Sequence, residues 1–159
     1  MIKIGDKLPD INMKIIEKGE TKDVQINNYF SGKKIVLFSV PGAFTPTCSA
    51  KHLPGFLKNI DKIKNKGIDE VVCLAVNDPF VMHAWGQKNN ALKDITFLAD
   101  GNADFSKEIG LVFDGSSFGL GIRSQRFAMV INACNVENLF IEKAGAFEVS
   151  SAEYVFSKL

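Results

Sequence analysis

A cysteine stands at the end of a short, stiff loop. The segment Pro41–Cys48 reads PGAFTPTC, and an apolar pattern of helical period begins just after it. At the first turn of a helix, free backbone N–H groups and the positive end of the helix dipole favour an anion, and such a setting lowers the pKa of a thiol. Because the thiolate is the nucleophilic form, we predict that Cys48 is a reactive thiol that the stiff loop fixes in position. The alternative is a small buried hydrophobic residue, as many free cysteines are.

The other two cysteines carry weaker signals. Cys73 lies within a strand-like apolar run, where a cysteine is either inert core or, after local unfolding, a disulfide partner. Cys134 falls in a predicted turn, and we expect an incidental surface thiol there. An odd cysteine count behind an N-terminus without a secretory pattern favours a reducing compartment. His52 and His83 have no partners at metal-ligand spacing, so we predict no metal and no other cofactor.

Alternating strand and helix patterns would position Cys48. Continuous apolar runs, typical of strands buried on both faces, cover 35–38, 71–76, 95–98 and 127–131. We also expect a strand at 139–141 after a turn at 132–138, and an N-terminal hairpin from 13–16 and 24–26. Three helices are predicted: one amphipathic helix over 53–63, one that opens at Asp78 and Pro79, and a final one after a capping box at 150–153. This order predicts one α/β domain over residues 1–159, with a central mixed sheet covered by helices on both faces. Ligand sites in such sheets gather at the carboxyl ends of strands, which is where Cys48 would lie.

Composition excludes several classes of partner. The 159 residues are 46% apolar and 23% charged, as in an ordinary globular protein. Nineteen basic and eighteen acidic residues give a net charge of +1, so nothing in the charge attracts nucleic acid or an anionic membrane. The apolar runs fall short of the ~20 residues of a membrane span.

Motifs follow one another in order along nearly the whole chain. They are Pro41–Cys48, His52–Phe56, Val76–Met82, Ala84–Gly86, Leu98–Gly101, Gly121–Phe127 and Val149–Ala152. Together they resemble the type II, or atypical, peroxiredoxins, which are thiol peroxidases with a thioredoxin-like fold. The resemblance implies that Cys48 is the peroxidatic cysteine, which attacks hydrogen peroxide or an alkyl hydroperoxide and becomes a sulfenic acid. Thr45 would hydrogen-bond the peroxide and the thiolate, and Pro41 would shield the thiol from water. Arg126 would be the arginine of the site, with Arg123 as a further candidate.

The same resemblance bears on how the sulfenic acid is reduced. Some members carry a resolving cysteine at the position of Cys73. Others carry one near the final helix, where this chain has Val149, so that route is closed. The valine in place of that resolving cysteine favours an external reductant, either glutathione with glutaredoxin or thioredoxin. Because type II peroxiredoxins form dimers, a homodimer is implied.

Two other functions remain open at this point. A thiol–disulfide oxidoreductase would normally carry Cys-x-x-Cys, but Thr45 stands three positions before Cys48. A redox-sensing switch would use Cys48 without turning over peroxide. We expect a cytoplasmic protein, although Ser157–Leu159 matches a peroxisomal address tripeptide that would act in a eukaryotic source.

Overall fold

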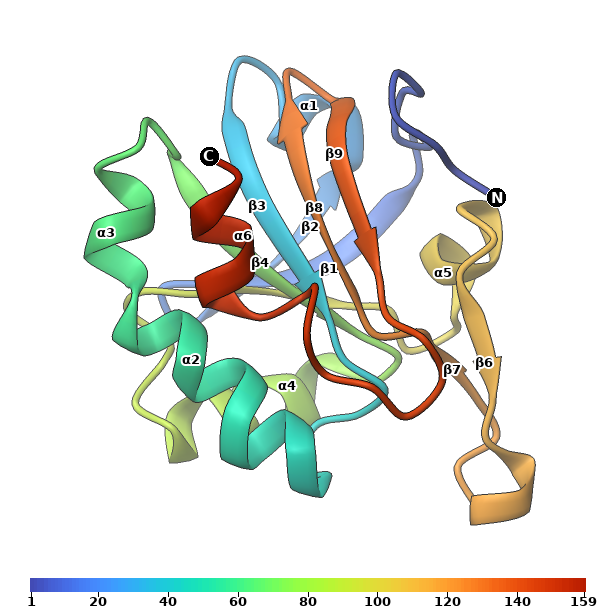
Figure 1. The fold of residues 1–159 in the computed structure, drawn as a ribbon. Helices are drawn as coiled ribbons and strands as arrows, with labels where there is room; N and C mark the ends of the chain where they lie inside the picture. The colour runs from blue at the N-terminus through green and yellow to red at the C-terminus, as the bar shows by residue number, and fades with distance from the viewer.

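A seven-stranded mixed sheet forms the centre of the computed structural model, which describes residues 1–159 (Figure 1). Its strands are β1 (Asn12–Glu17), β2 (Glu20–Gln25), β3 (Lys34–Ser39), β4 (Glu70–Ala75), β5 (Thr96–Ala99), β8 (Phe127–Asn132) and β9 (Asn135–Ile141). They lie in the order β2-β1-β5-β4-β3-β8-β9. The pairs β3–β4 and β4–β5 are parallel, and the outer pairs are antiparallel. The predicted mixed sheet is confirmed.

Helices cover both faces of the sheet. They are α1 (Ile26–Tyr29), the π-helix η1 (Cys48–His52), α2 (Leu53–Lys58), α3 (Ile60–Lys64), α4 (Pro79–Lys88), α5 (Asp104–Glu108) and α6 (Ala152–Ser157). Side chains alternate between the faces along each strand. On β3, Val36 and Phe38 pack with α2, α3, α4 and α6, whereas Ile35 and Leu37 pack with α1 and α5. Both predicted layers of helix are therefore present, and none of the helices is long and apolar enough to cross a membrane.

The predicted helix over 53–63 is interrupted. Its apolar positions are buried as expected, but the helix breaks at Asn59, whose backbone has φ −104° and ψ 11°. The Asn59 side chain donates to the carbonyl of Gly55 at 2.8 Å. The same carbonyl also accepts from the backbone N–H of Asn59 at 3.2 Å, so it carries two donors at the break.

The predicted hairpin of 127–131 with 139–141 is confirmed, but its turn is shorter than the predicted 132–138. Only Ala133 and Cys134 form the turn, with φ of 47° and 70°, and β9 begins at Asn135. The expectation of a surface thiol at Cys134 is wrong, because Cys134 is buried against the α1 side of the sheet. Its Sγ lies 3.5 Å from the carbonyl oxygen of Asn27, and burial raises its pKa.

Two further local differences concern the last third of the chain. The N-cap of α6 is Ser151, whose Oγ accepts from the backbone N–H of Tyr154 at 3.2 Å, rather than Ser150. Ser150 is unavailable because its hydroxyl bonds Glu142. A second, two-stranded sheet of β6 (Val112–Asp114) and β7 (Ile122–Ser124), joined through the 3₁₀ turn η2 (Ser116–Phe118), was not predicted, since its strands are three residues long with little apolar patterning.

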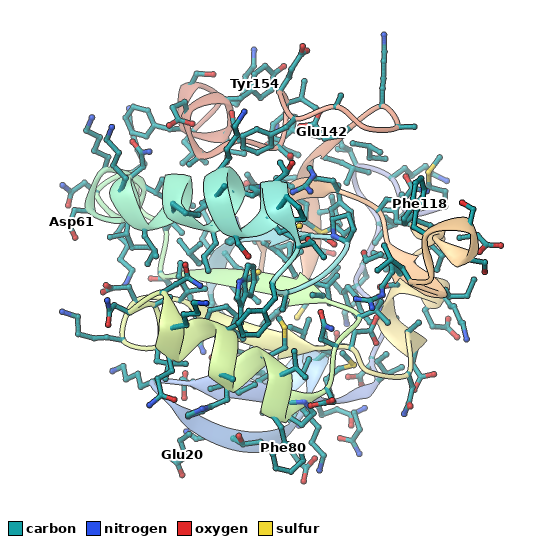
Figure 2. All side chains as sticks on the ribbon, turned by 90° about the horizontal axis from the view of Figure 1, so that it is seen from below. Glu20, Asp61, Phe80, Phe118, Glu142 and Tyr154 are labelled. Atoms are coloured by element: carbon teal, nitrogen blue, oxygen red, sulfur yellow. The ribbon has the colours of Figure 1, made fainter.

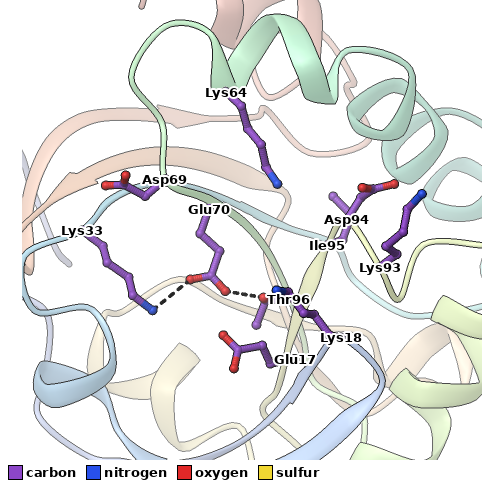
Figure 3. A pocket seen from close by; sticks show the side chains of 10 residues that line it. All are labelled: Glu17, Lys18, Lys33, Lys64, Asp69, Glu70, Lys93, Asp94, Ile95 and Thr96. Carbon is purple, nitrogen blue, oxygen red and sulfur yellow. Dashed lines mark hydrogen bonds and ion pairs between the residues drawn. The ribbon is translucent and has the colours of Figure 1, made fainter.

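A polar pocket of about 270 Å³ lies at the amino ends of β4 and β5 (Figure 3). Tyr29 donates toward the carboxylates of Glu17 and Glu70, and Thr96 also bonds Glu70. Lys33 pairs with Glu70 and lies over the Tyr29 ring. Because the Cys48 loop follows the carboxyl end of β3, this pocket is at the opposite edge of the sheet from that loop.

Candidate active site

The loop that carries Cys48 is anchored to the next parallel strand end. The loop follows β3, and Asn77 follows β4, the neighbour of β3. Asn77 Oδ1 accepts from the backbone N–H of Ala43 at 2.9 Å. A Cβ at Gly42 would lie 2.7 Å from Nη1 of Arg123, so the arginine packs directly on the loop backbone there. The ends of two parallel strands and an arginine therefore fix the loop on its strand edge, as the sequence predicted for Cys48.

Cys48 begins η1 and is buried, with 1% of its surface exposed. The next residue, Ser49, accepts a hydrogen bond at its Oγ from Trp85 Nε1 at 3.0 Å. This bond ties the first turn of η1 to α4. The predicted placement of the thiol in the first turn of a helix is confirmed, with π-helical rather than α-helical geometry.

Arg126 approaches the sulfur from β8, the neighbour of β3 on the side opposite β4. Strand β8 is antiparallel to β3, so its first residue, Phe127, pairs with Ser39 at the end of β3. Arg126 precedes β8 and therefore lies at the same edge as the Cys48 loop. Its Nη2 donates to Cys48 Sγ at 3.2 Å, and its Nη1 donates to His52 Nδ1 at 2.8 Å.

His52 is a buried neutral acceptor. Its Nε2 lies 2.9 Å from the carbonyl oxygen of Ser150, which can only accept, so the ring proton is on Nε2 and Nδ1 is free to accept from Arg126. Burial lowers the pKa of His52 to about 3, and the charge of Arg126 acts in the same direction. The ring lies against Phe38 and Phe147. The imidazole therefore orients the guanidinium without adding charge.

Thr45 and Pro41 lie on the same loop as the thiol. Thr45 Oγ1 donates to the carbonyl of Gly42 at 2.6 Å, which leaves the lone pairs of its oxygen to accept another donor. The carbonyl of Pro41 accepts from Arg123 Nη1 at 3.3 Å, and Arg123 Nε donates to Leu120 at 2.9 Å. Arg123 thus braces the loop, and it is Arg126 that bonds the sulfur.

Comparison with known proteins identifies the family. The redoxin family model matches residues 3–156. Peroxiredoxin-2D of Arabidopsis thaliana is 44% identical over 159 residues, which cover 99% of this chain and 98% of the relative. The reduced Prx3 of Vibrio vulnificus, solved in complex with hydrogen peroxide, superposes with a TM-score of 0.94 at 46% identity over 99% of each chain. Peroxiredoxin 5 of Alvinella pompejana superposes with a TM-score of 0.85 at 34% identity, over 99% of this chain and 97% of that one.

The chain belongs to the type II peroxiredoxins. It is therefore an enzyme, a thiol peroxidase of the oxidoreductase class, and its fold is the thioredoxin-like fold of that family. The family and fold expected from the sequence are confirmed. Of the residues expected at the peroxiredoxin site, Arg126 bonds the sulfur of Cys48, whereas the side chain of Thr45 bonds Gly42 and the carbonyl of Pro41 bonds Arg123, so the roles of Thr45 and Pro41 stay predictions.

Cys73 lies in the core beneath the site of this peroxiredoxin. It pairs in register with Phe38 and is fully buried, in the same apolar cluster as Cys48. Burial raises the pKa of Cys73 well above its usual value. A negative charge on Cys48 raises that pKa further, and Arg126 opposes the rise. All three cysteines are free, so Cys73 is a neutral thiol in this state. No three metal-binding side chains gather anywhere in the structure.

Sequence reasoning missed several residues that support the site. Asn77 and Trp85 entered only within the motifs that carry the resemblance, Ser150 only within such a motif and a capping box, and Glu142 not at all. The only sequence signal for Asn77 is its place directly after a core strand. Nothing local indicates the partners of Trp85, Ser150 or Glu142, since each bonds a residue brought near by folding.

Proposed function

We propose that this peroxiredoxin reduces hydrogen peroxide and alkyl hydroperoxides with Cys48 as the attacking thiolate. The observation that carries the proposal is the bond from Arg126 Nη2 to Cys48 Sγ at 3.2 Å. A guanidinium at that distance is placed to stabilise the negative charge that moves from the sulfur to the departing oxygen. Thr45, whose oxygen can still accept a hydrogen bond, supports the binding of a peroxide O–H beside the sulfur.

The peroxide step breaks one bond and forms another. The Cys48 thiolate attacks one peroxide oxygen, an S–O bond forms, and the O–O bond breaks. The departing oxygen leaves as water or an alcohol after it takes up one proton, and Cys48 becomes a sulfenic acid. Negative charge grows on the departing oxygen in the transition state, where fixed donors such as Arg126 stabilise it more than in the ground state. Pro41 would limit the access of water to the thiol.

The sulfenic acid then needs two thiols. The first condenses with it, releases water and forms a disulfide, and the second reduces this disulfide and restores the thiolate. We propose an external reductant, either glutathione with glutaredoxin or thioredoxin, with Cys73 as a candidate internal resolving thiol. Because Cys48 and Cys73 are both buried, either route requires local opening of η1. Non-reducing mass spectrometry of peroxide-treated protein, with and without glutathione, would show whether Cys48 pairs with Cys73, with glutathione or with neither.

We also propose a homodimer that covers the surface beside the Cys48 loop. Phe44 on that loop is 49% exposed, and Phe118 on the connection between β6 and β7 is 74% exposed. Figure 2 labels Phe118. Arg123 on the same hairpin contacts the loop at Pro41, which connects the two aromatic sites. Light scattering of the protein as it elutes from a size-exclusion column should give twice the mass of one chain. Phe118→Ser should shift the mass toward one chain, and a monomeric wild type would contradict the proposal.

The compartment stays a prediction. We propose the cytoplasm, with peroxisomal import only in a eukaryotic source. Ser157 is the last residue of α6, and Leu159 packs partly against the core, so a receptor would have to detach Leu159 to read the tripeptide. A reporter fused to the amino terminus would be punctate if import occurs and diffuse if it does not.

The direct test of the proposed activity is the rate at which hydrogen peroxide oxidises Cys48. That rate should exceed the rate for free cysteine by orders of magnitude, and Cys48→Ser should abolish turnover. A rate equal to that of free cysteine would contradict the proposal.

A further inference from the structure

Both ends of Arg126 are held by one hydrogen-bonded ring. The carbonyl oxygen of Arg126 accepts from the backbone N–H of Glu142 at 3.1 Å. At the other end, its guanidinium bonds His52, which bonds the carbonyl of Ser150. Ser150 in turn bonds the carboxylate of Glu142 through its backbone N–H and its hydroxyl, at 2.9 and 2.7 Å. The ring of hydrogen bonds therefore begins at the backbone carbonyl of Arg126 and ends at the guanidinium of the same residue.

Glu142 closes this ring through three donors on one oxygen. Besides the two groups of Ser150, the backbone N–H of Glu148 donates to Oε2 at 2.6 Å. Burial alone would raise the pKa of Glu142, but these hydrogen bonds outweigh it and hold the pKa below its usual value. The carboxylate is therefore ionised at neutral pH and fixes the backbone on both sides of Val149.

The two partners of His52, the carbonyl of Ser150 and the guanidinium of Arg126, together fix the orientation and the tautomer of its ring. Since a carbonyl only accepts, it requires the proton on Nε2 and leaves the Nδ1 lone pair toward Arg126. If the carbonyl moved away, the buried Nε2–H would lose its acceptor, and the imidazole would be free to turn and carry the guanidinium off its place. A displacement of this kind matters, because a misplacement of 1 Å caused far from the reacting atoms can cost roughly 100-fold in rate.

We infer that Glu142 is a positioning residue for the peroxide step, which acts through Ser150 and His52 to hold Arg126 on the sulfur of Cys48. The inference rests on the proposed function of Cys48. Glu142 touches no reacting atom, and its side chain is separated from Cys48 by three residues of the ring. Its role is to place the guanidinium before peroxide arrives.

Three variants of the full chain separate this role from a structural one. Glu142→Ala removes the acceptor, and Glu142→Gln keeps an oxygen that can accept the same donors without the charge. Glu148→Gln is the matched control, because its exposed carboxylate lies in the same loop and only its backbone N–H contacts Glu142. The readouts are the rate of Cys48 oxidation by hydrogen peroxide and the rate of Cys48 alkylation by iodoacetamide.

We expect Glu142→Ala to lower both rates by about tenfold, which is less than the roughly 100-fold of a full 1 Å misplacement. Glu142→Gln should retain most of both rates, and Glu148→Gln should match the wild type. In a His52→Phe background, which removes both ring nitrogens, Glu142→Ala should cause no further fall in rate. If the Ala variant does not fold, Ser150→Ala, which removes one of the three donors, should give a smaller fall of the same kind.

Unchanged rates in folded Glu142→Ala or Ser150→Ala would overturn the inference, as would an equal fall in the His52→Phe background. The failure of the proposed function gives a different result. In that case wild-type Cys48 would react with peroxide no faster than free cysteine. The alkylation rates would still report whether Glu142 acts on Cys48 through His52.

Discussion

Arg126 Nη2 lies 3.2 Å from Cys48 Sγ, although 78 positions separate the two residues in the chain. The contact depends on the antiparallel pairing of β8 with β3, which brings the start of one strand to the end of the other. A charged donor is thereby fixed on a buried sulfur, in surroundings where electrostatic interactions are stronger than in water.

Replacement of Arg126 should affect chemistry far more than folding. Arg126→Gln removes the guanidinium charge and the donor on Cys48 Sγ. Loss of one preorganised donor of this type costs about 2.7–4 kcal/mol, so the rate of Cys48 oxidation should fall by roughly 100- to 1,000-fold. Stopped-flow oxidation by hydrogen peroxide measures this fall. Arg123→Gln should cost less, because Arg123 bonds loop carbonyls; an equal loss in the two variants would contradict the assignment.

His52 makes stability depend on pH below neutrality. Its pKa is about 3 in the folded protein, against about 6.5 in an unfolded chain. Between these values the unfolded state binds the extra proton, so the free energy of unfolding should decrease as pH falls from about 6.5, by up to about 1.4 kcal/mol per pH unit. Urea unfolding at several pH values tests this. His52→Phe, which cannot titrate, should show a shallower dependence, and identical slopes would refute the prediction.

Asn77 should matter to the loop rather than to the sulfur. Asn77→Ala leaves the buried backbone N–H of Ala43 without its acceptor, which typically costs about 1–3 kcal/mol. We expect lower thermal stability and a higher KM for peroxide. The matched variant Asn89→Ala loses a bond to the carbonyl of Trp85 at the far end of α4 and should leave KM unchanged. An unaltered KM in Asn77→Ala would mean that the loop is held without this bond.

The pocket at the opposite edge of the sheet should contribute to stability alone. Burial raises the pKa of Tyr29, and the hydrogen bonds to Glu70 and Glu17 raise it further, so the hydroxyl stays protonated and separates two carboxylates. Tyr29→Phe removes that donor and should lower the free energy of unfolding by about 1–3 kcal/mol. Peroxide oxidation of Cys48 should be unaffected. A change in the oxidation rate would indicate coupling across the sheet.

Local sequence patterns were sufficient for the features that depend on neighbours in the chain. The strand before Pro41 and the apolar spacing after Cys48 already place the thiol at a sheet edge. The turn expected over 132–138 is shorter than predicted because Ala133 and Cys134 both adopt positive φ, which turn rules assign to glycine and asparagine. The break at Asn59 was missed because the apolar spacing continues through it, with Phe56, Ile60 and Ile63 all in one core cluster.

The supporting shell of the site could not be predicted in the same way. The resemblance to a known family pointed to Arg126 as a site residue. The bond of Arg126 to His52 and the ring of hydrogen bonds through Glu142 join segments that only the folded sheet brings together. Ser150 shows the limit clearly. Its spacing to Glu153 fits a capping box, but in the folded chain its hydroxyl donates to Glu142. Ser151 is therefore the N-cap of α6.

The most direct measurement is rapid-quench mass spectrometry of the reduced protein mixed with hydrogen peroxide. It follows the gain of one oxygen at Cys48, Cys73 and Cys134 separately. Oxidation should appear first at Cys48, orders of magnitude faster than in free cysteine, and Arg126→Gln should slow it by roughly 100- to 1,000-fold. Oxidation at the rate of free cysteine, or first at another cysteine, would contradict the account.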